Sequence, residues 1–172
     1  GVNYFTGQVF DMQKITRAAH DAGAFCGWDL AHGIGNIELK LHEWQVDFAA
    51  WCSYKYLNSS PGSVAGMFVH EKHLNNPAIP RFEGWWGTDP QTRFLMEDTF
   101  RPMDSAGAWQ LSNAPVLTMA AHKAALDIFE EAGFENLRTK MRAMNSYLDF
   151  VLDEIIRMKG AGKMEIIDRK ST

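Results

Sequence analysis

The chain has 172 residues, of which 46% are hydrophobic and 22% are charged, and its formal net charge is −4. This composition is typical of a soluble globular protein and excludes a general electrostatic attraction to nucleic acid. No apolar run approaches the roughly 20 residues that a membrane span requires, and residues 1–20 lack the pattern of a secretory signal. Cys26 and Cys52 fall in apolar runs, which indicates free thiols and a reducing compartment such as the cytoplasm.

The first half of the chain alternates strand-like and helix-like segments. Residues 2–6 are predicted to form a strand, and Asp11 is predicted to cap a helix that runs through Ala22 and ends at Gly23. Three further strands are expected at residues 24–28, 47–52 and 64–70. A short helix is expected at residues 37–44. This alternation indicates an α/β fold built on a mostly parallel sheet.

The second half begins with a long irregular segment and continues as helix. Residues 71–114 contain four prolines and two adjacent tryptophans, which predicts a long ordered loop with a functional role. Asn113 is predicted to cap a helix that includes Pro115 and ends near Gly133. A second helix is expected over residues 135–159, followed by the start of a strand at residues 164–167.

Asp29 and Lys55 carry the strongest chemical signal. Asp29 directly follows the apolar run 24–28, and Lys55 closely follows the run 47–52. Because the carboxyl ends of parallel strands meet at one edge of a sheet, we expect both side chains to converge on one ligand. A lysine and an aspartate facing one ring are what pyridoxal phosphate requires, since the lysine forms the Schiff base and the aspartate keeps the ring nitrogen protonated.

Other interpretations of the polar motifs are weaker. Asp29 with His32 has the spacing of half a metal site, but no third and fourth ligand stands nearby, so no metal is predicted. Residues 70–73 (His-Glu-Lys-His) are interpreted as a solvated helix start rather than a metal pair. Residues 33–35 (Gly-Ile-Gly) lack the third glycine of a dinucleotide-binding loop.

Several strings of residues resemble those of kynureninase, in the same order and at similar spacing. They are Gly27-Trp28-Asp29-Leu30-Ala31-His32, Trp51-Cys52-Ser53-Tyr54-Lys55-Tyr56-Leu57-Asn58, Gly84-Trp85-Trp86-Gly87 and Leu111-Ser112-Asn113. The resemblance implies a homodimeric, cytoplasmic pyridoxal 5'-phosphate enzyme of fold type I, which is the aspartate-aminotransferase-like fold. It also implies hydrolysis of L-kynurenine or 3-hydroxykynurenine to anthranilate or 3-hydroxyanthranilate and L-alanine, in tryptophan catabolism and NAD biosynthesis.

The resemblance also implies roles for individual residues. Lys55 would be the Schiff-base lysine and Tyr54 its partner in proton transfer. The cofactor would be bound by Asp29, His32, Tyr54, Lys55 and Trp85. Asn113 would lie near the aromatic ring of the substrate.

The resemblance divides the chain into two parts. Residues 1–114 would form the later part of the large cofactor-binding domain, and residues 115–172 the first helices of a small domain. The phosphate-binding turn and the arginine that holds the substrate carboxylate would lie outside these 172 residues, so we expect this chain alone to be inactive.

Two alternatives remain open. One is another fold-type-I enzyme of the cysteine desulfurase kind, although such enzymes usually carry His immediately before the lysine, where Tyr54 stands here. The other is an inactive structural fragment.

Overall fold

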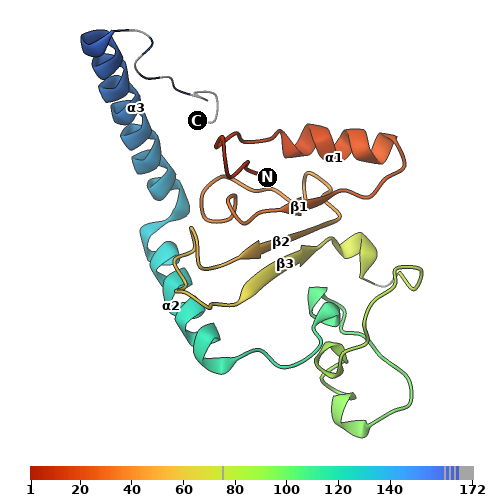
Figure 1. Cartoon of the computed structure of the whole chain (residues 1–172). Coiled ribbons are helices and arrows are strands. Elements are labelled where there is room, and N and C mark those ends of the chain that lie inside the picture. The colour runs from red at the N-terminus through yellow and green to blue at the C-terminus, as the bar shows by residue number, and fades with distance from the viewer. Residues whose placement is uncertain (75, 161, 163, 165, 167–172) are drawn as a thin grey trace.

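The computed structural model describes residues 1–74, 76–160, 162, 164 and 166, and the predicted strand at 164–167 therefore lies largely outside the described residues. A three-stranded sheet of order β1-β2-β3 stands at the centre of the described part (Figure 1). β1 (Gly27–Asp29) is parallel to β2 (Phe48–Cys52), and β3 (Ala65–Val69) is antiparallel to β2. The α/β class is confirmed, with a mixed sheet.

The first helix is where the sequence predicts it. α1 (Met12–Asp21) begins after Asp11, whose carboxylate accepts a hydrogen bond from the Lys14 amide at 3.0 Å. The chain leaves the helix through Gly23 at a φ of 77°, a left-handed conformation that favours glycine.

The strand predicted at residues 2–6 is wrong. Val2 and Val9 form one isolated antiparallel bridge, and the chain turns between them. The Asn3 side chain accepts hydrogen bonds from the Phe5 and Thr6 amides at 2.9 and 3.1 Å. Because an asparagine side chain can replace a strand partner in this way, it stabilises a local turn in place of an extended ladder.

The helix predicted at residues 37–44 is also wrong. The segment has no regular secondary structure at residues 38–40 and then turns at residues 41–45, where Gln45 has a φ of 58°. Ile37, Leu39 and Leu41 recur at every second position, and all three pack against the core. An alternation of two is the period of extended backbone, so a helix would have turned part of this set away from the core.

The sheet is covered on one face only. The buried side chains of Met12, Leu30 and Ala49 form the core, and partly buried Trp28, Trp51 and Phe68 pack against it. Alternate positions of the strands point to the other face, where Phe48 is 53% and Met67 45% exposed. The runs that the sequence suggests as buried strands are therefore buried on one side in this chain.

Two helices follow the irregular segment. α2 (Val116–Ala132) and α3 (Phe134–Lys159) are separated by Gly133, at a φ of 74°. The predicted cap at Asn113 is wrong, because Pro115 occupies the cap position and the Asn113 amide oxygen instead accepts a hydrogen bond from the Ser112 hydroxyl. In the described part of the chain, no helix is long and apolar enough to cross a membrane.

The described residues 71–74 and 76–114 form a long loop, as predicted, with four short 3-10 helices: η1 (Glu71–His73), η2 (Trp85–Gly87), η3 (Arg93–Leu95) and η4 (Ala106–Trp109). The Arg93 guanidinium lies 4.1 Å from the centre of the Trp86 ring and donates to the carbonyls of Trp86 and Thr88. Arg81 lies 4.1 Å from the centre of the Trp109 ring. Such cation–π contacts hold the segment together where regular ladders are absent.

A buried carboxylate gathers several elements just before β2 begins. Asp47 is 2% exposed, and its oxygens lie 2.7 Å from His20 Nε2, 2.8 Å from His73 Nε2 and 2.8 Å from Lys72 Nζ. The amide of Cys26 also donates to it at 2.7 Å. The helix start predicted at residues 70–73 is confirmed as the short 3-10 helix Glu71–His73, and Glu71 and Lys72 are exposed as expected. The solvation predicted for the two histidines is wrong, because His70 is buried and His73 contacts Asp47.

Burial raises the pKa of Asp47, but hydrogen bonds from Cys26, Lys72 and the two histidines outweigh it and hold this pKa well below its ordinary value. The ionised carboxylate is therefore favoured in the folded state. This stabilisation is present at pH 7 and is lost as the pH falls below about 4 toward the folded-state pKa.

We predict that Asp47→Ala destabilises the whole protein by about 3 kcal/mol at pH 7, because it leaves Lys72 and two histidines facing a buried site without their counter-ion. The measurement is the shift of the urea-unfolding midpoint. Asp127→Ala is the matched control, since it breaks an exposed ion pair with Lys123 and should cost less than about 1 kcal/mol. Equal effects of the two substitutions would contradict the structural role of the cluster.

Candidate functional site

The carboxyl ends of β1 and β2 lie at one edge of the sheet. Their parallel register pairs Asp29, the last residue of β1, with Ala50, and β2 ends two residues later at Cys52. The loop of residues 53–63 follows and carries Lys55. Asp29 and Lys55 are thus placed at the same edge, as the two apolar runs predict.

His32 and Lys55 connect the two strand-end loops. Lys55 Nζ lies 2.9 Å from His32 Nε2, within hydrogen-bond distance. The His32 ring meets the Tyr56 ring edge to face, with centroids 5.9 Å apart, and Lys55 Nζ lies 6.0 Å from the centre of the Tyr54 ring. An ammonium group has donors but no acceptor, so a charged Lys55 requires His32 Nε2 to be the unprotonated nitrogen. The site therefore offers an amine held by an imidazole.

The loop that carries Lys55 is folded back on itself by hydrogen bonds. The Ser53 side chain is fully buried and its hydroxyl donates to the Val64 carbonyl. The Ser59 amide donates to the Ser53 carbonyl at 3.1 Å, and the Asn58 amide to the Lys55 carbonyl at 3.1 Å. These bonds fix the backbone on both sides of the lysine.

A glycine allows the first loop to approach the second. A Cβ on Gly35 would lie 2.9 Å from Leu57 Cδ2 and 3.0 Å from the Tyr56 carbonyl oxygen. Gly35 also has a φ of 72°. Both observations require glycine here, and its absence of a side chain lets the two strand-end loops pack directly.

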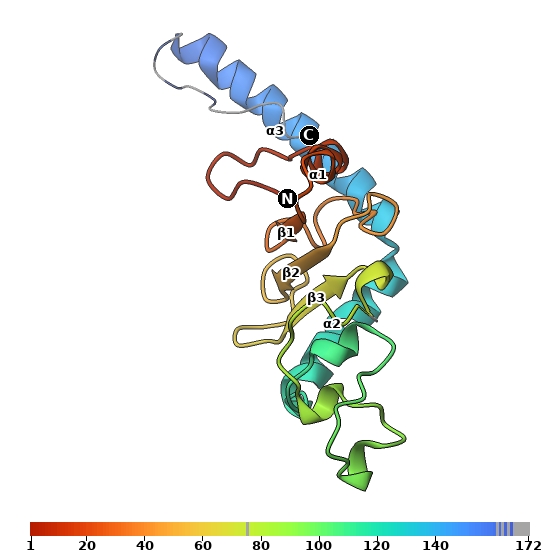
Figure 2. The same cartoon turned by 90° about the vertical axis from the view of Figure 1, so that its right-hand side faces the viewer.

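The helices α2 and α3 pass this same edge of the sheet. Figure 1 shows them standing on the side toward which β2 points, and Figure 2, turned by 90°, agrees. His122 Nδ1 of α2 lies 2.7 Å from the Ser59 hydroxyl, and Arg138 of α3 lies 3.4 Å from the Glu38 carboxylate. Sequence reasoning found no role for His122, since nothing local connects positions 59 and 122.

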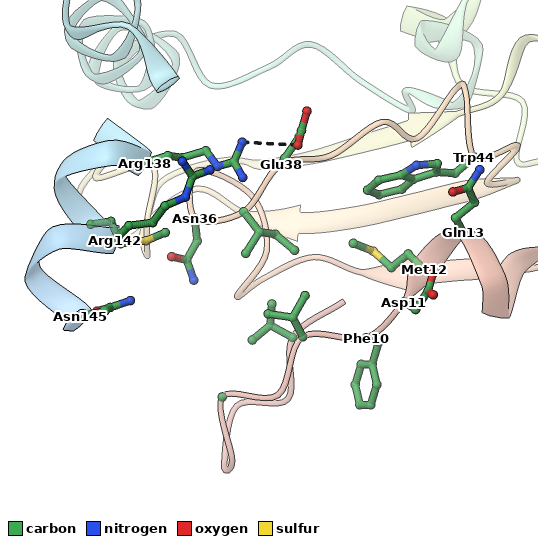
Figure 3. A pocket seen from close by; sticks show the side chains of 15 residues that line it. Phe10, Asp11, Met12, Gln13, Asn36, Glu38, Trp44, Arg138, Arg142 and Asn145 are labelled. Atoms are coloured by element: carbon green, nitrogen blue, oxygen red, sulfur yellow. Dashed lines mark hydrogen bonds and ion pairs between the residues drawn. The ribbon is translucent and has the colours of Figure 1, made fainter. Parts of the chain in front are cut away.

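A cavity of about 480 Å³ lies between the N-terminal turn, residues 36–44 and α3 (Figure 3). Arg138 points into it and contacts Glu38, while both Arg138 and Arg142 contact the Glu135 carboxylate at 3.0 and 3.3 Å. Because carboxylates already neutralise both guanidinium groups, we interpret this cavity as a junction between α3 and the sheet rather than as an anion site.

Trp85 and Asn113 lie in the irregular segment that precedes α2. A Cβ on Gly84 would lie 2.2 Å from Leu111 Cα, so this glycine lets the turn with Trp85 press against the backbone that leads to Asn113. No hydrogen bond, ion pair or ring contact joins either side chain to Asp29, His32 or Lys55 among the described residues. The structure thus brings three of the predicted site residues to one edge, with Tyr54 beside them, and leaves two elsewhere.

The residues at the sheet edge fit pyridoxal phosphate by their chemistry. An amine for covalent attachment, an imidazole to hold it and a carboxylate for a ring nitrogen stand on neighbouring strand ends. The Asp29 carboxylate accepts a hydrogen bond from the Ala31 amide at 2.8 Å and is exposed on the uncovered face of the sheet. Within the described residues, no group of three or more His, Cys, Asp or Glu could hold a metal ion.

Comparison with known proteins gives a consistent result. The family model described as Aminotransferase class-V matches residues 1–170. The chain is 61% identical over 155 residues to a kynureninase of Christiangramia forsetii and 57% identical over 155 residues to one of Flavobacterium johnsoniae. Each match covers 90% of this chain and 36% of the relative, so the chain spans little more than a third of their length. The predicted resemblance to kynureninase is confirmed.

Solved structures agree on the fold. The cysteine desulfurase CsdA of Escherichia coli matches with a TM-score of 0.67 at 18% identity, over 88% of this chain and 36% of that one. A ureidoglycine-glyoxylate aminotransferase of Bacillus subtilis matches with a TM-score of 0.56 at 20% identity, over 84% of this chain and 35% of that one. Enzymes of this family and fold use pyridoxal phosphate, and the predicted fold type and cofactor are confirmed.

Proposed function

This chain belongs to the aminotransferase class-V family, and we propose that the whole protein hydrolyses L-kynurenine or 3-hydroxykynurenine to an anthranilate and L-alanine. The observation that carries this proposal is the contact between Lys55 and His32 at the carboxyl ends of two parallel strands. Identity of 51–61% to kynureninases over about 90% of the chain supports it.

Pyridoxal phosphate, when bound, supplies an electron sink for negative charge that develops at the α carbon of the substrate. The Lys55 amine removes the proton from that carbon, and His32 Nε2 accepts a hydrogen bond from the ammonium group so formed. Asp29 would pair with the ring nitrogen and keep it protonated. Tyr54 and Trp85 would hold the phosphate group, and the Tyr54 hydroxyl would assist proton transfer.

We further propose that the protein is a cytoplasmic homodimer with shared sites. Among the described residues, no hydrogen bond or ring contact joins the side chains of Trp85 and Asn113 to Lys55, which supports their contribution to the site of a second subunit. In this proposal, Asn113 lies near the aromatic ring of the substrate. Residues 1–114 belong to the large domain, and α2 and α3 begin the small domain, in keeping with the start of α2 at Val116.

We predict that the whole protein releases anthranilate and alanine from L-kynurenine at an ordinary enzymatic rate, on the order of 1 per second. Lys55→Ala should lower this rate at least about 100-fold, because it removes the base that takes the α proton. Borohydride reduction followed by peptide mapping should find the cofactor on Lys55. The control is Lys40→Ala, which removes a half-exposed lysine close to Glu38 and should leave the rate unchanged. A cofactor label on another lysine would refute the assignment.

Asp29→Asn in the whole protein should retain the cofactor on Lys55 but lower kcat by roughly 100-fold or more, because a neutral amide does not keep the ring nitrogen protonated. Turnover and borohydride-fixed cofactor are measured on the same samples. Asp21→Asn, at an exposed position at the end of α1, is the matched control and should behave as the unaltered protein. Near-normal turnover of Asp29→Asn would rule out the role proposed for Asp29.

A mixture of two inactive variants should recover activity if sites are shared. A heterodimer of Lys55→Ala and Asn113→Ala subunits has one site with both residues intact, so random mixing should restore up to about a quarter of the original activity. Heterodimers are verified by distinct affinity tags, and each variant alone is the control. Verified heterodimers without activity would show that each site is built within one chain.

A further inference from the structure

Ser59 occupies a constrained position in the loop that carries Lys55. Its side chain is 1% exposed, and its neighbours Asn58 and Ser60 have φ values of 56° and 75°. Residues other than glycine rarely adopt such left-handed conformations, and they persist only where the surroundings enforce them. Left-handed residues stand on both sides of the buried Ser59. This indicates that contacts from other segments of the chain hold this part of the loop in place.

One of these contacts comes from α2. His122 Nδ1 lies 2.7 Å from the Ser59 hydroxyl oxygen, and that hydroxyl lies 3.3 Å from the Leu57 carbonyl. A hydroxyl has one proton to donate. Both contacts are satisfied when Ser59 donates to Leu57 and His122 donates from Nδ1 to Ser59.

The backbone continues this connection to Lys55. The Ser59 amide donates to the Ser53 carbonyl, which closes the loop at its base, and the Asn58 amide donates to the Lys55 carbonyl. A displacement of Ser59 therefore moves the peptide groups that define where the lysine backbone lies. His32 holds the amine of Lys55 from the other side, from the loop after β1.

We infer that His122 is a positioning residue, which acts through Ser59 to hold the loop of residues 53–63 so that the Lys55 amine stays at the sheet edge. The inference rests on the proposed function only for what Lys55 does there. In the described structure, α2 makes no hydrogen bond to Lys55 or His32. The inference nevertheless gives α2 a part in shaping the site, through Ser59.

The test measures the loop itself, with the whole protein free of cofactor. Hydrogen–deuterium exchange of peptides spanning residues 53–63 should speed up by roughly 2- to 10-fold in His122→Ala, which is the range expected from the loss of one hydrogen bond. Ser59→Ala should give a similar effect, and the double variant should be no faster than the faster single one, because both remove the same bond. Lys123→Ala, at the exposed neighbouring position on α2, is the matched control and should leave the loop unchanged.

Rescue separates this role from general support of the helix. Asn places its amide nitrogen near the position of Nδ1, whereas Gln places it farther out. His122→Asn should therefore slow exchange of the loop back toward the original rate, and His122→Gln should not. Lys123→Asn and Lys123→Gln control for helix propensity. In protein loaded with pyridoxal phosphate, cofactor dissociation measured by absorbance should rise with loop exchange in the same variants.

Unchanged loop exchange in His122→Ala would overturn the inference. Faster exchange spread evenly over α2 and the sheet, or equal effects of Asn and Gln, would also overturn it, since His122 would then serve only the stability of the helix. These results come from cofactor-free protein. They are therefore distinguishable from a failure of the proposed reaction, which would appear as absence of kynurenine turnover in the unaltered protein.

Discussion

The parallel pairing of β1 with β2 is the constraint on which the site depends. It places the ends of both strands at one edge, so that Asp29 and the loop with Lys55 face the same region although 26 positions separate them in the chain. An antiparallel pairing would have put them at opposite edges. The hydrogen bond between His32 and Lys55 is possible because His32 follows β1 as Lys55 follows β2.

The two ends of β2 carry different kinds of polar cluster. At its amino end, Asp47 gathers His20, Lys72 and His73 around one buried carboxylate, and every charge has a close partner. At its carboxyl end, Lys55 Nζ is within hydrogen-bond distance of His32 Nε2, and Asp29, at the end of the neighbouring β1, is exposed. A satisfied buried cluster stabilises a fold, whereas an exposed carboxylate and an amine held by an imidazole can bind a ligand without disrupting a buried ion pair.

Sequence patterns predicted the elements that depend on local chemistry. The cap at Asp11, the glycine ends at Gly23 and Gly133 and the strand β2 were all predicted from adjacent residues. The helix predicted at residues 37–44 was wrong, because the alternating apolar residues there pack against a core that distant segments assemble. Contacts such as Ser59–His122 join residues 63 positions apart, and no local spacing encodes such a pair.

The uncovered face of the sheet bears directly on the chemistry of Asp29. This carboxylate lies on the same face as Phe48 and Met67, which are about half exposed. In water, two unit charges 4 Å apart attract by about 1 kcal/mol, but near a protein surface of lower effective dielectric the attraction is about 4 kcal/mol. Covering this apolar face with protein would therefore strengthen the hold of Asp29 on a protonated ring nitrogen several-fold, without any change at the strand end itself. The strand pairing places the charged groups, whereas the surroundings of this face set how strongly they act.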